Sequence, residues 1–335
     1  MKKIYFLILI LVAVLSSGCE RIWLKKAESA TAQNVFEEAW TFADREYSFF
    51  TFKDIDWDSV RDVFEPQVAD LTSDEELFQL LDDMLFTLRD GHVNLRSPFD
   101  RSRNWEWFLN SPPNFDIDVL ERNYYQDSQR FVGPFVVRDF GDVGYMRYSS
   151  FSSFVPGSTL DAVLEDFQDK KGLIIDLRSN GGGSLSNVYT LASRFVTEER
   201  TMAKERVKIG PEHDAFSAME DLTVEPDGDT SFLKPVVLLT NRKCYSATTF
   251  FSTFMSSLPQ VTIIGDTTGG GGGAPSFTSL PNGWTIRVSS TQLFTVDEFN
   301  VEDGLPPDIQ IDMDSLNLMN GIDDILERGL EEIRK

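Results

Sequence analysis

The chain has 335 residues, of which 41% are hydrophobic and 25% are charged, so it is long enough to bury one large core or two modest ones. Its formal net charge of −23 at pH 7 argues against nucleic acid or an anionic membrane surface as the main partner, because both repel an acidic protein.

The first residues have the features of a secretory signal peptide. Two lysines precede an apolar run over residues 4–15, which is too short to span a membrane, and small residues follow it. Cys19 comes directly after these small residues, an arrangement that resembles the bacterial lipobox. The resemblance implies cleavage before Cys19 and lipidation of its thiol, whereas simple secretion is the alternative. We therefore expect a signal peptide over 1–18, a lipid-anchored tether over 19–33 and a place in the bacterial cell envelope, in the outer membrane.

Helical periodicity follows the tether and continues over residues 35–88. Apolar side chains recur three and four positions apart in two stretches, one around Trp40 and one from residue 77 to 88. Ser73 and Glu76 have the spacing of a capping box at the start of the second stretch. We expect a helical subdomain over residues 34–96.

From residue 97 to 335 the pattern is that of an α/β domain. Residues 97–140 are aromatic and irregular, and we expect loops with some edge strand there. Apolar strands and helices then alternate, with an acidic insertion of weak periodicity over 197–232, and this alternation predicts a mixed α/β fold. The predicted strands cover residues 143–151, 173–177, 235–240, 261–264 and 284–293, and the predicted helices cover 159–167, 185–196, 246–257 and 322–333.

Ser246 lies where the strand over 235–240 turns into a helix. A serine at this position often caps the helix with its side chain. It can also be a nucleophile, because the free N–H groups of the first helical turn, here that of Ala247, can hold a developing oxyanion. The stretch alone leaves both interpretations open.

A nucleophilic serine needs a base, and the chain offers few candidates. Histidine is the commonest base near neutral pH, and the chain has two, of which His213 lies in the acidic insertion and is expected to be solvated. His92 follows a glycine at the end of the helical subdomain and is either the base or a structural residue. A lysine base downstream of Ser246 is excluded, because no lysine lies between Lys243 and Lys335.

Two further segments carry candidate residues. Residues 173–183 form a buried strand that ends in a charged pair and three glycines, which allow a backbone N–H to approach an oxyanion. A phosphate-binding loop is the alternative, but neither standard nucleotide-binding glycine pattern is matched here or at the five glycines of 269–273. Residues 301–308 place Glu302 in a rigid Gly/Pro turn. There it either is solvated, or it orients the base or helps the site electrostatically.

Together these segments resemble the C-terminal processing (tail-specific) serine peptidase family over about residues 35–335. The similarity lies in four motifs that occur in the family's order. Glycine stands in this chain where the family's lysine-using branch has its lysine, so the chain is similar to the tricorn-type branch, which uses histidine, serine and glutamate. The motifs are Leu-Arg-Asp-Gly-His at 88–92, Asp-Leu-Arg-Ser-Asn-Gly-Gly-Gly at 176–183, Ser-Ala at 246–247 and the run from Glu302 to Asp308.

The resemblance implies a crotonase/ClpP-like peptidase core and a site for each role. It makes Ser246, His92 and Glu302 the catalytic residues. The resemblance also implies a polypeptide or peptide substrate, and it implies neither a cofactor nor a metal. The segment between His92 and residue 143 is too short for the PDZ domain that many members of the family carry. A catalytically silent lipoprotein that binds a peptide or an apolar ligand, like the interphotoreceptor retinoid-binding protein of the same family, is the alternative. The implied oxyanion donors are Ala247 and Gly182, and the implied supporting residues are Asp176, Arg178, Asn180, Gly181 and Gly183.

Overall fold

The computed structural model describes residues 30–105 and 109–335. The predicted signal peptide, Cys19 and most of the tether lie outside the described residues, as does part of the aromatic stretch. Within the described ranges, no helix combines the length and the apolar character needed to cross a membrane.

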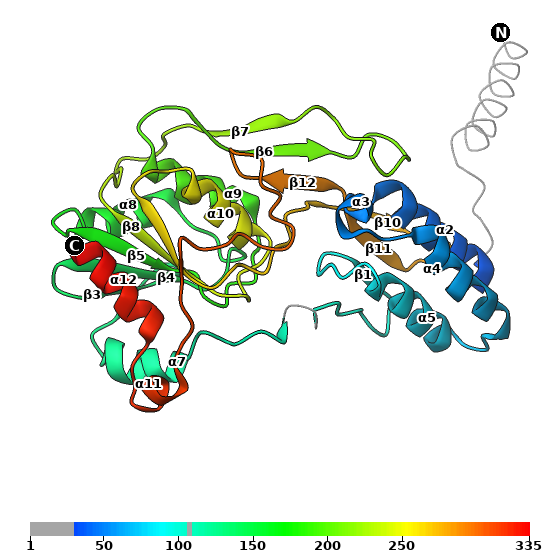
Figure 1. Cartoon of the computed structure of the whole chain (residues 1–335), viewed down its shortest axis with the longest axis horizontal. Coiled ribbons are helices and arrows are strands. Elements are labelled where there is room, and N and C mark those ends of the chain that lie inside the picture. The colour runs from blue at the N-terminus through cyan, green and yellow to red at the C-terminus, as the bar shows by residue number, and fades with distance from the viewer. Residues whose placement is uncertain (1–29, 106–108) are drawn as a thin grey trace, which may run out of the picture.

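A seven-stranded sheet forms the centre of the larger part of the molecule (Figure 1). Its strand order is β13-β9-β8-β5-β4-β3-β2, in which the first five strands are parallel and the last two form an antiparallel edge. All residues of β5 and β8 are buried, as expected for branched apolar runs in a sheet covered on both faces. The strands are β2 (Arg130–Val132), β3 (Phe135–Asp139), β4 (Val143–Tyr148), β5 (Gly172–Asp176), β8 (Val236–Thr240), β9 (Val261–Gly265) and β13 (Ile309–Gln310).

Helices cover both faces of this sheet. Alternate residues of β5 point to opposite faces, so that Leu173 and Ile175 pack with α8, α9 and α10, whereas Ile174 packs with α12. Figure 1 shows α12 in red across one face of the sheet. These helices are α8 (Gly157–Asp166), α9 (Leu185–Ala192) with its 3₁₀ extension (Ser193–Phe195), α10 (Ala247–Ser256) and α12 (Asp324–Arg334). The shorter α7 (Ile117–Val119), a π-helix (Leu120–Tyr125) and α11 (Ser315–Met319) complete this part, and the sequence predicted none of these three.

The N-terminal helices form the predicted second unit, but the unit is larger than residues 34–96. Strand β1 (Asn94–Arg96) pairs with β11 (Thr285–Ser289), which pairs with β10 (Pro275–Ser279). Trp284 and Ile286 are buried in the same apolar cluster as the helices, and Figure 1 shows β10 and β11 in orange beside the blue helices. The helices are α2 (Ala32–Glu46), α3 (Phe50–Lys53), α4 (Trp57–Phe64) with the 3₁₀ helix Glu65–Asp70, and α5 (Asp74–Phe86).

Two segments form strands that differ from their local pattern for the same reason. The acidic insertion forms the strands β6 (Arg200–Val207) and β7 (Glu220–Val224), and the predicted strand 284–293 is divided between β11 and β12 (Thr291–Phe294). Strand β12 pairs with β6 in a separate three-stranded sheet, order β12-β6-β7. Pairing between distant segments decides these strands, and local periodicity does not report it. The mixed α/β fold with a helical N-terminal unit is otherwise the predicted one.

Candidate active site

Two neighbouring parallel strands bring the candidate motifs together. Strands β5 and β8 are paired, so the segments that follow them, 177–183 and 241–246, leave the sheet at the same edge, where ligand sites of open α/β sheets usually lie. The Tyr245 N–H donates to the Asn180 carbonyl at 3.1 Å, which joins the two segments directly. Ser246 stands at the end of the second one.

Ser246 does not cap its helix. Its backbone has φ 56° and ψ −122°, a strained conformation for a residue with a side chain, and its hydroxyl makes no capping hydrogen bond. Instead Ser246 Oγ lies 2.8 Å from Nε2 of His92, which comes from the N-terminal unit. The structure therefore supports the nucleophile interpretation of Ser246 over the cap, with the strained turn typical of exposed nucleophiles.

His92 is only 6% exposed, and this burial governs its charge. Burial lowers the pKa of His92 to about 4, while the charge of Asp90 opposes that decrease. The ring is therefore neutral at pH 7. In the described part of the chain, Nδ1 of His92 makes no hydrogen bond of ordinary geometry. A backbone interaction with Gly273 nevertheless raises the pKa of His92, which is the effect of a carbonyl that accepts from the ring. A proton on Nδ1 leaves Nε2 free to accept one from Ser246.

Asp90 is a site residue that the sequence analysis did not assign. Asp90 is fully buried. Its Oδ1 accepts a hydrogen bond from the backbone N–H of His92 at 2.7 Å and another from the Tyr245 hydroxyl at 3.2 Å. Its Oδ2 accepts the Ser289 hydroxyl at 2.8 Å. Although burial opposes ionisation, the charge of Lys53 and these hydrogen bonds hold the pKa of Asp90 below its usual value. Its place two residues before His92 was the only signal in the sequence.

The glycine segment packs directly against the nucleophile. A Cβ on Gly182 would lie 2.8 Å from the Cβ of Ser246 and 2.9 Å from the backbone nitrogen of Ala247, and Gly182 has φ +94°. Asn180 holds the segment in place, because its Oδ1 accepts the Gly182 N–H at 3.0 Å. That bond changes one prediction, since the Gly182 N–H is already engaged and is not available to an oxyanion. A Cβ on Gly183 would collide with the backbone of residues 151 and 152.

The charged pair of the same motif is structural. Arg178 is fully buried and bonds Asp176 at 2.7 Å and Asp323 at 2.9 Å. Asp323 in turn caps α12 by accepting the Leu326 N–H. The motif thus attaches the end of β5 to the C-terminal helix, which fixes the base of the glycine segment.

Glu302 is fully buried, so the solvated alternative is wrong. Its carboxylate is 2.7 Å from Lys53 Nζ and accepts the Gly272 N–H at 3.1 Å, and no contact in the described ranges joins it to the His92 ring. Burial raises the pKa of Glu302 to about 8, and Lys53 opposes the rise. Lys53 belongs to helix α3 of the N-terminal unit, and nothing in the local sequence indicated this pairing.

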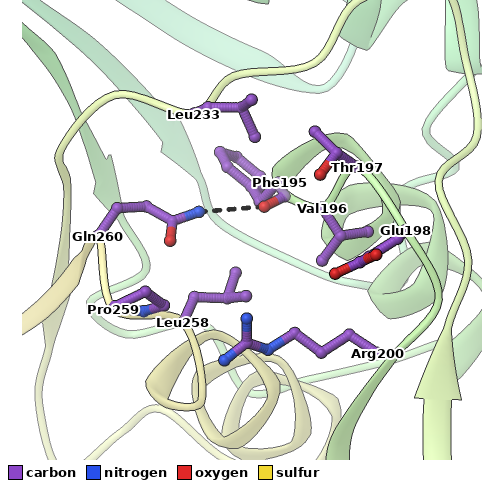
Figure 2. A pocket seen from close by; sticks show the side chains of 9 residues that line it. All are labelled: Phe195, Val196, Thr197, Glu198, Arg200, Leu233, Leu258, Pro259 and Gln260. Carbon is purple, nitrogen blue, oxygen red and sulfur yellow. Dashed lines mark hydrogen bonds between the residues drawn. The ribbon is translucent and has the colours of Figure 1, made fainter.

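An open cleft of about 630 Å³ lies in front of Ser246. Its lining includes His92, Tyr245 and Ser246 from the site, and Arg101, Lys243 and Arg287 around it. Figure 2 shows a smaller cavity of about 160 Å³ near Phe195 and Leu258, which contains none of the predicted site residues. The larger cleft is therefore the candidate substrate site.

The second histidine lies outside the site. His213 Nε2 is 2.8 Å from Asp44 Oδ1, and its ring stacks on Phe50 at 4.2 Å between centroids. It was predicted to be solvated and its side chain is 37% exposed, but it also joins the β6–β7 insertion to the N-terminal helices.

Comparison with known proteins identifies the family of the chain. Residues 142–311 match peptidase family S41, and residues 29–86 match the tricorn protease C1 domain. The crystal structure of a candidate peptidase from Parabacteroides merdae is similar with a TM-score of 0.86 and 38% identity, covering 91% of this chain and 97% of that one.

Curated relatives are more distant. The carboxy-terminal-processing protease of Bartonella bacilliformis is 26% identical over 201 residues, which are 58% of this chain and 44% of that protein. The carboxy-terminal processing protease CtpA of Bacillus subtilis is 23% identical over 175 residues, 51% of this chain and 35% of that protein. The chain thus matches less than half the length of either relative. The family match spans half of the chain and contains Ser246 and Glu302, so the chain belongs to peptidase family S41.

Proposed function

We propose that this protein is a serine endopeptidase in which Ser246 is the nucleophile and His92 is the general base. The observation that carries the proposal is the 2.8 Å contact between Ser246 Oγ and His92 Nε2, two residues 154 positions apart in the chain. A serine hydroxyl is a weak nucleophile at neutral pH and needs such a base. The strained backbone of Ser246 and the cleft in front of it support the same assignment.

In the acylation step, Ser246 Oγ bonds to the carbonyl carbon of the scissile peptide while its proton moves to His92 Nε2. The C–N bond then breaks, and His92 gives the proton to the leaving amine. Water hydrolyses the resulting ester with the same base, which releases the new carboxyl end and Ser246. His92 can accept the proton because its low pKa keeps it neutral, and the ionised Asp90 favours the imidazolium that forms.

The Ala247 N–H is the donor proposed for the oxyanion. It is the first amide of α10 and donates to no acceptor among the described residues, as expected for the first turn of a helix. The helix dipole also favours negative charge at this end. Because Asn180 already occupies the Gly182 N–H, a second donor must come from another amide near the same segment.

We assign Glu302 to positioning the glycine loop 269–273. Its side chain accepts the Gly272 N–H, its carbonyl accepts the Gly271 N–H at 3.2 Å, and the same loop accepts the Ser246 N–H at Gly270. Glu302→Ala is expected to lower kcat at least about tenfold with little change in KM, since it removes the acceptor of the Gly272 N–H and a displaced loop misplaces the reacting groups. Glu298→Ala, at an exposed neighbour, is the control, and a rise in KM with unchanged kcat would contradict the assignment.

The central test compares the purified protein with Ser246→Ala on a pool of unfolded peptides, with fragments identified by mass spectrometry. Ser256→Ala is the matched control, because Ser256 is exposed at the far end of the same helix. We expect cleavage by the wild type and Ser256→Ala and a loss of at least about 10³-fold in Ser246→Ala. Equal cleavage by Ser246→Ala would refute the nucleophile. No cleavage by any of the three would favour the ligand-binding alternative, with a search for a co-purified apolar ligand.

We also propose that the protein is a lipid-anchored protein of the bacterial envelope and that its substrates are proteins or peptides of that compartment. The support is the sequence pattern that ends at Cys19. Detergent phase partition of cell extracts tests it, with Cys19→Ser as the comparison. The full-length protein is expected in the detergent phase and Cys19→Ser in the aqueous phase, and partition of both into the aqueous phase would contradict the anchor.

A further inference from the structure

The described residues that line the cleft carry a charge opposite to that of the whole protein. The chain has 54 acidic and 31 basic residues, and its formal net charge is −23. Among the described residues that line the cleft, however, the charged side chains are Arg101, Lys243 and Arg287, and none is acidic. Asp90 lies below the cleft and is fully buried. The charged lining that the structure describes is thus basic in an acidic chain, and a cleft concentrates the field of the charges that line it.

None of these three cations is neutralised by an ion pair within the described ranges. Arg101 and Lys243 are exposed, and their side chains form no hydrogen bond or ion pair with a described residue. Arg287 is half-buried and donates to two neutral acceptors, the His92 carbonyl at 2.9 Å and Asn94 Oδ1. Burial lowers the pKa of Arg287, the negative charge of buried Asp90 opposes this decrease, and the charge of Arg101 adds to it, so the two guanidinium groups repel each other. Arg287 stays charged, because arginine is protonated at all ordinary pH values.

The cations come from two parts of the chain. Arg287 is anchored to the backbone of His92, and Arg101 follows β1 in the same N-terminal unit. Lys243 belongs to the α/β part and lies three residues before Ser246 in the turn after β8. All three line the cleft with Ser246, so a peptide bound at Ser246 lies within a positively charged lining.

We propose that the cleft selects acidic peptide segments, with Asp or Glu side chains beside the scissile bond. This inference rests on the proposed peptidase function and adds the substrate class to it. Carboxylates on the substrate would complete the ion pairs that the cleft leaves open, and the partly buried guanidinium can bind one through two parallel hydrogen bonds. The excess negative charge elsewhere on the protein keeps acidic substrates from binding at other places.

The test uses three series of peptides that have the same length and differ only next to the cleavage site. The acidic series carries Asp and Glu there, the neutral series Asn and Gln, and the third series Lys. Each peptide is made with a free and with an amidated C-terminus. We expect kcat/KM for the acidic series to exceed that for the neutral series by about tenfold, with the lysine series lowest and the difference reduced by salt. The preference should persist after amidation. Equal rates for all three series, or dependence on the terminal carboxylate alone, would overturn the proposal.

Charge reversal locates the effect. Arg101→Glu and Lys243→Glu are each expected to lower kcat/KM for the acidic series several-fold more than for the neutral series, whereas Arg122→Glu, which is exposed and outside the cleft lining, should leave the ratio of the two unchanged. The same peptides bound to Ser246→Ala and followed by fluorescence anisotropy test the charge preference without cleavage. If Ser246→Ala binds acidic peptides and the wild type cleaves none, the peptidase function fails while the selectivity holds. Binding without charge preference would overturn the selectivity.

Discussion

The buried position of His92 gives a sharp prediction for the pH dependence of activity. The base must be neutral to accept a proton, and burial lowers the pKa of His92 from 6.5 to about 4. At pH 5.5 a histidine of pKa 6.5 would be only about a tenth neutral, whereas one of pKa 4 would be about 97% neutral. We therefore expect kcat/KM at pH 5.5 to be close to its value at pH 7.5, with the acid limb near pH 4.

The assay measures kcat/KM from pH 3.5 to 8 at constant ionic strength, with a peptide that has no group titrating in this range. Tryptophan fluorescence at each pH checks that the protein stays folded. This check matters because the folded-state pKa of His92 is depressed, so the unfolded state binds the proton first as the pH falls. The free energy of unfolding changes by about 1.4 kcal/mol per pH unit for one such proton, so it falls by about 3 kcal/mol between pH 6.5 and 4 because of His92.

Two variants make the result specific to His92. His213→Gln should leave the acid limb unchanged, because His213 lies outside the cleft. Asp90→Asn should move the limb to lower pH, because the charge of Asp90 raises the pKa of His92. A loss of about nine tenths of kcat/KM at pH 5.5 in folded wild-type protein would refute the reasoning, since it would require a solvated base or a different one.

Two further substitutions test the packing around the nucleophile and the structural pair of the central motif. Gly182→Ala is expected to lower kcat about 100-fold, because its Cβ would lie 2.8 Å from that of Ser246. Gly181→Ala should retain much more activity, since a Cβ there meets nothing within 4 Å. Similar activities for the two variants would contradict this reasoning. Arg178→Met should destabilise the protein by about 3–5 kcal/mol in urea unfolding, because it leaves two buried carboxylates without their cation, and a loss below about 1 kcal/mol would show that the pair is dispensable. Arg122→Met removes only an exposed pair and is the control.

Much of the fold was predictable from local patterns. The buried runs of β5 and β8, the helix after Ser246 and the helical N-terminal residues all follow from the spacing of apolar side chains along a continuous stretch. The capping box at Ser73 is confirmed in its first half, since Ser73 Oγ accepts the Glu76 N–H at 3.2 Å, while the Glu76 carboxylate turns to Thr72 instead. Such features depend only on neighbours in the chain.

The sequence also determined which residue types and motifs are present, and it favoured Ser246 and His92 as partners through the order of the motifs. The structure brings these two side chains to 2.8 Å. No local pattern indicated that Lys53 pairs with Glu302, 249 residues further along the chain, or that β11 joins the N-terminal helices. Nor did any local pattern show that Asn180 Oδ1 accepts the Gly182 N–H. These contacts depend on the register between distant segments and on which hydrogen-bond partner lies nearest after packing, and both are set only when the whole chain has folded.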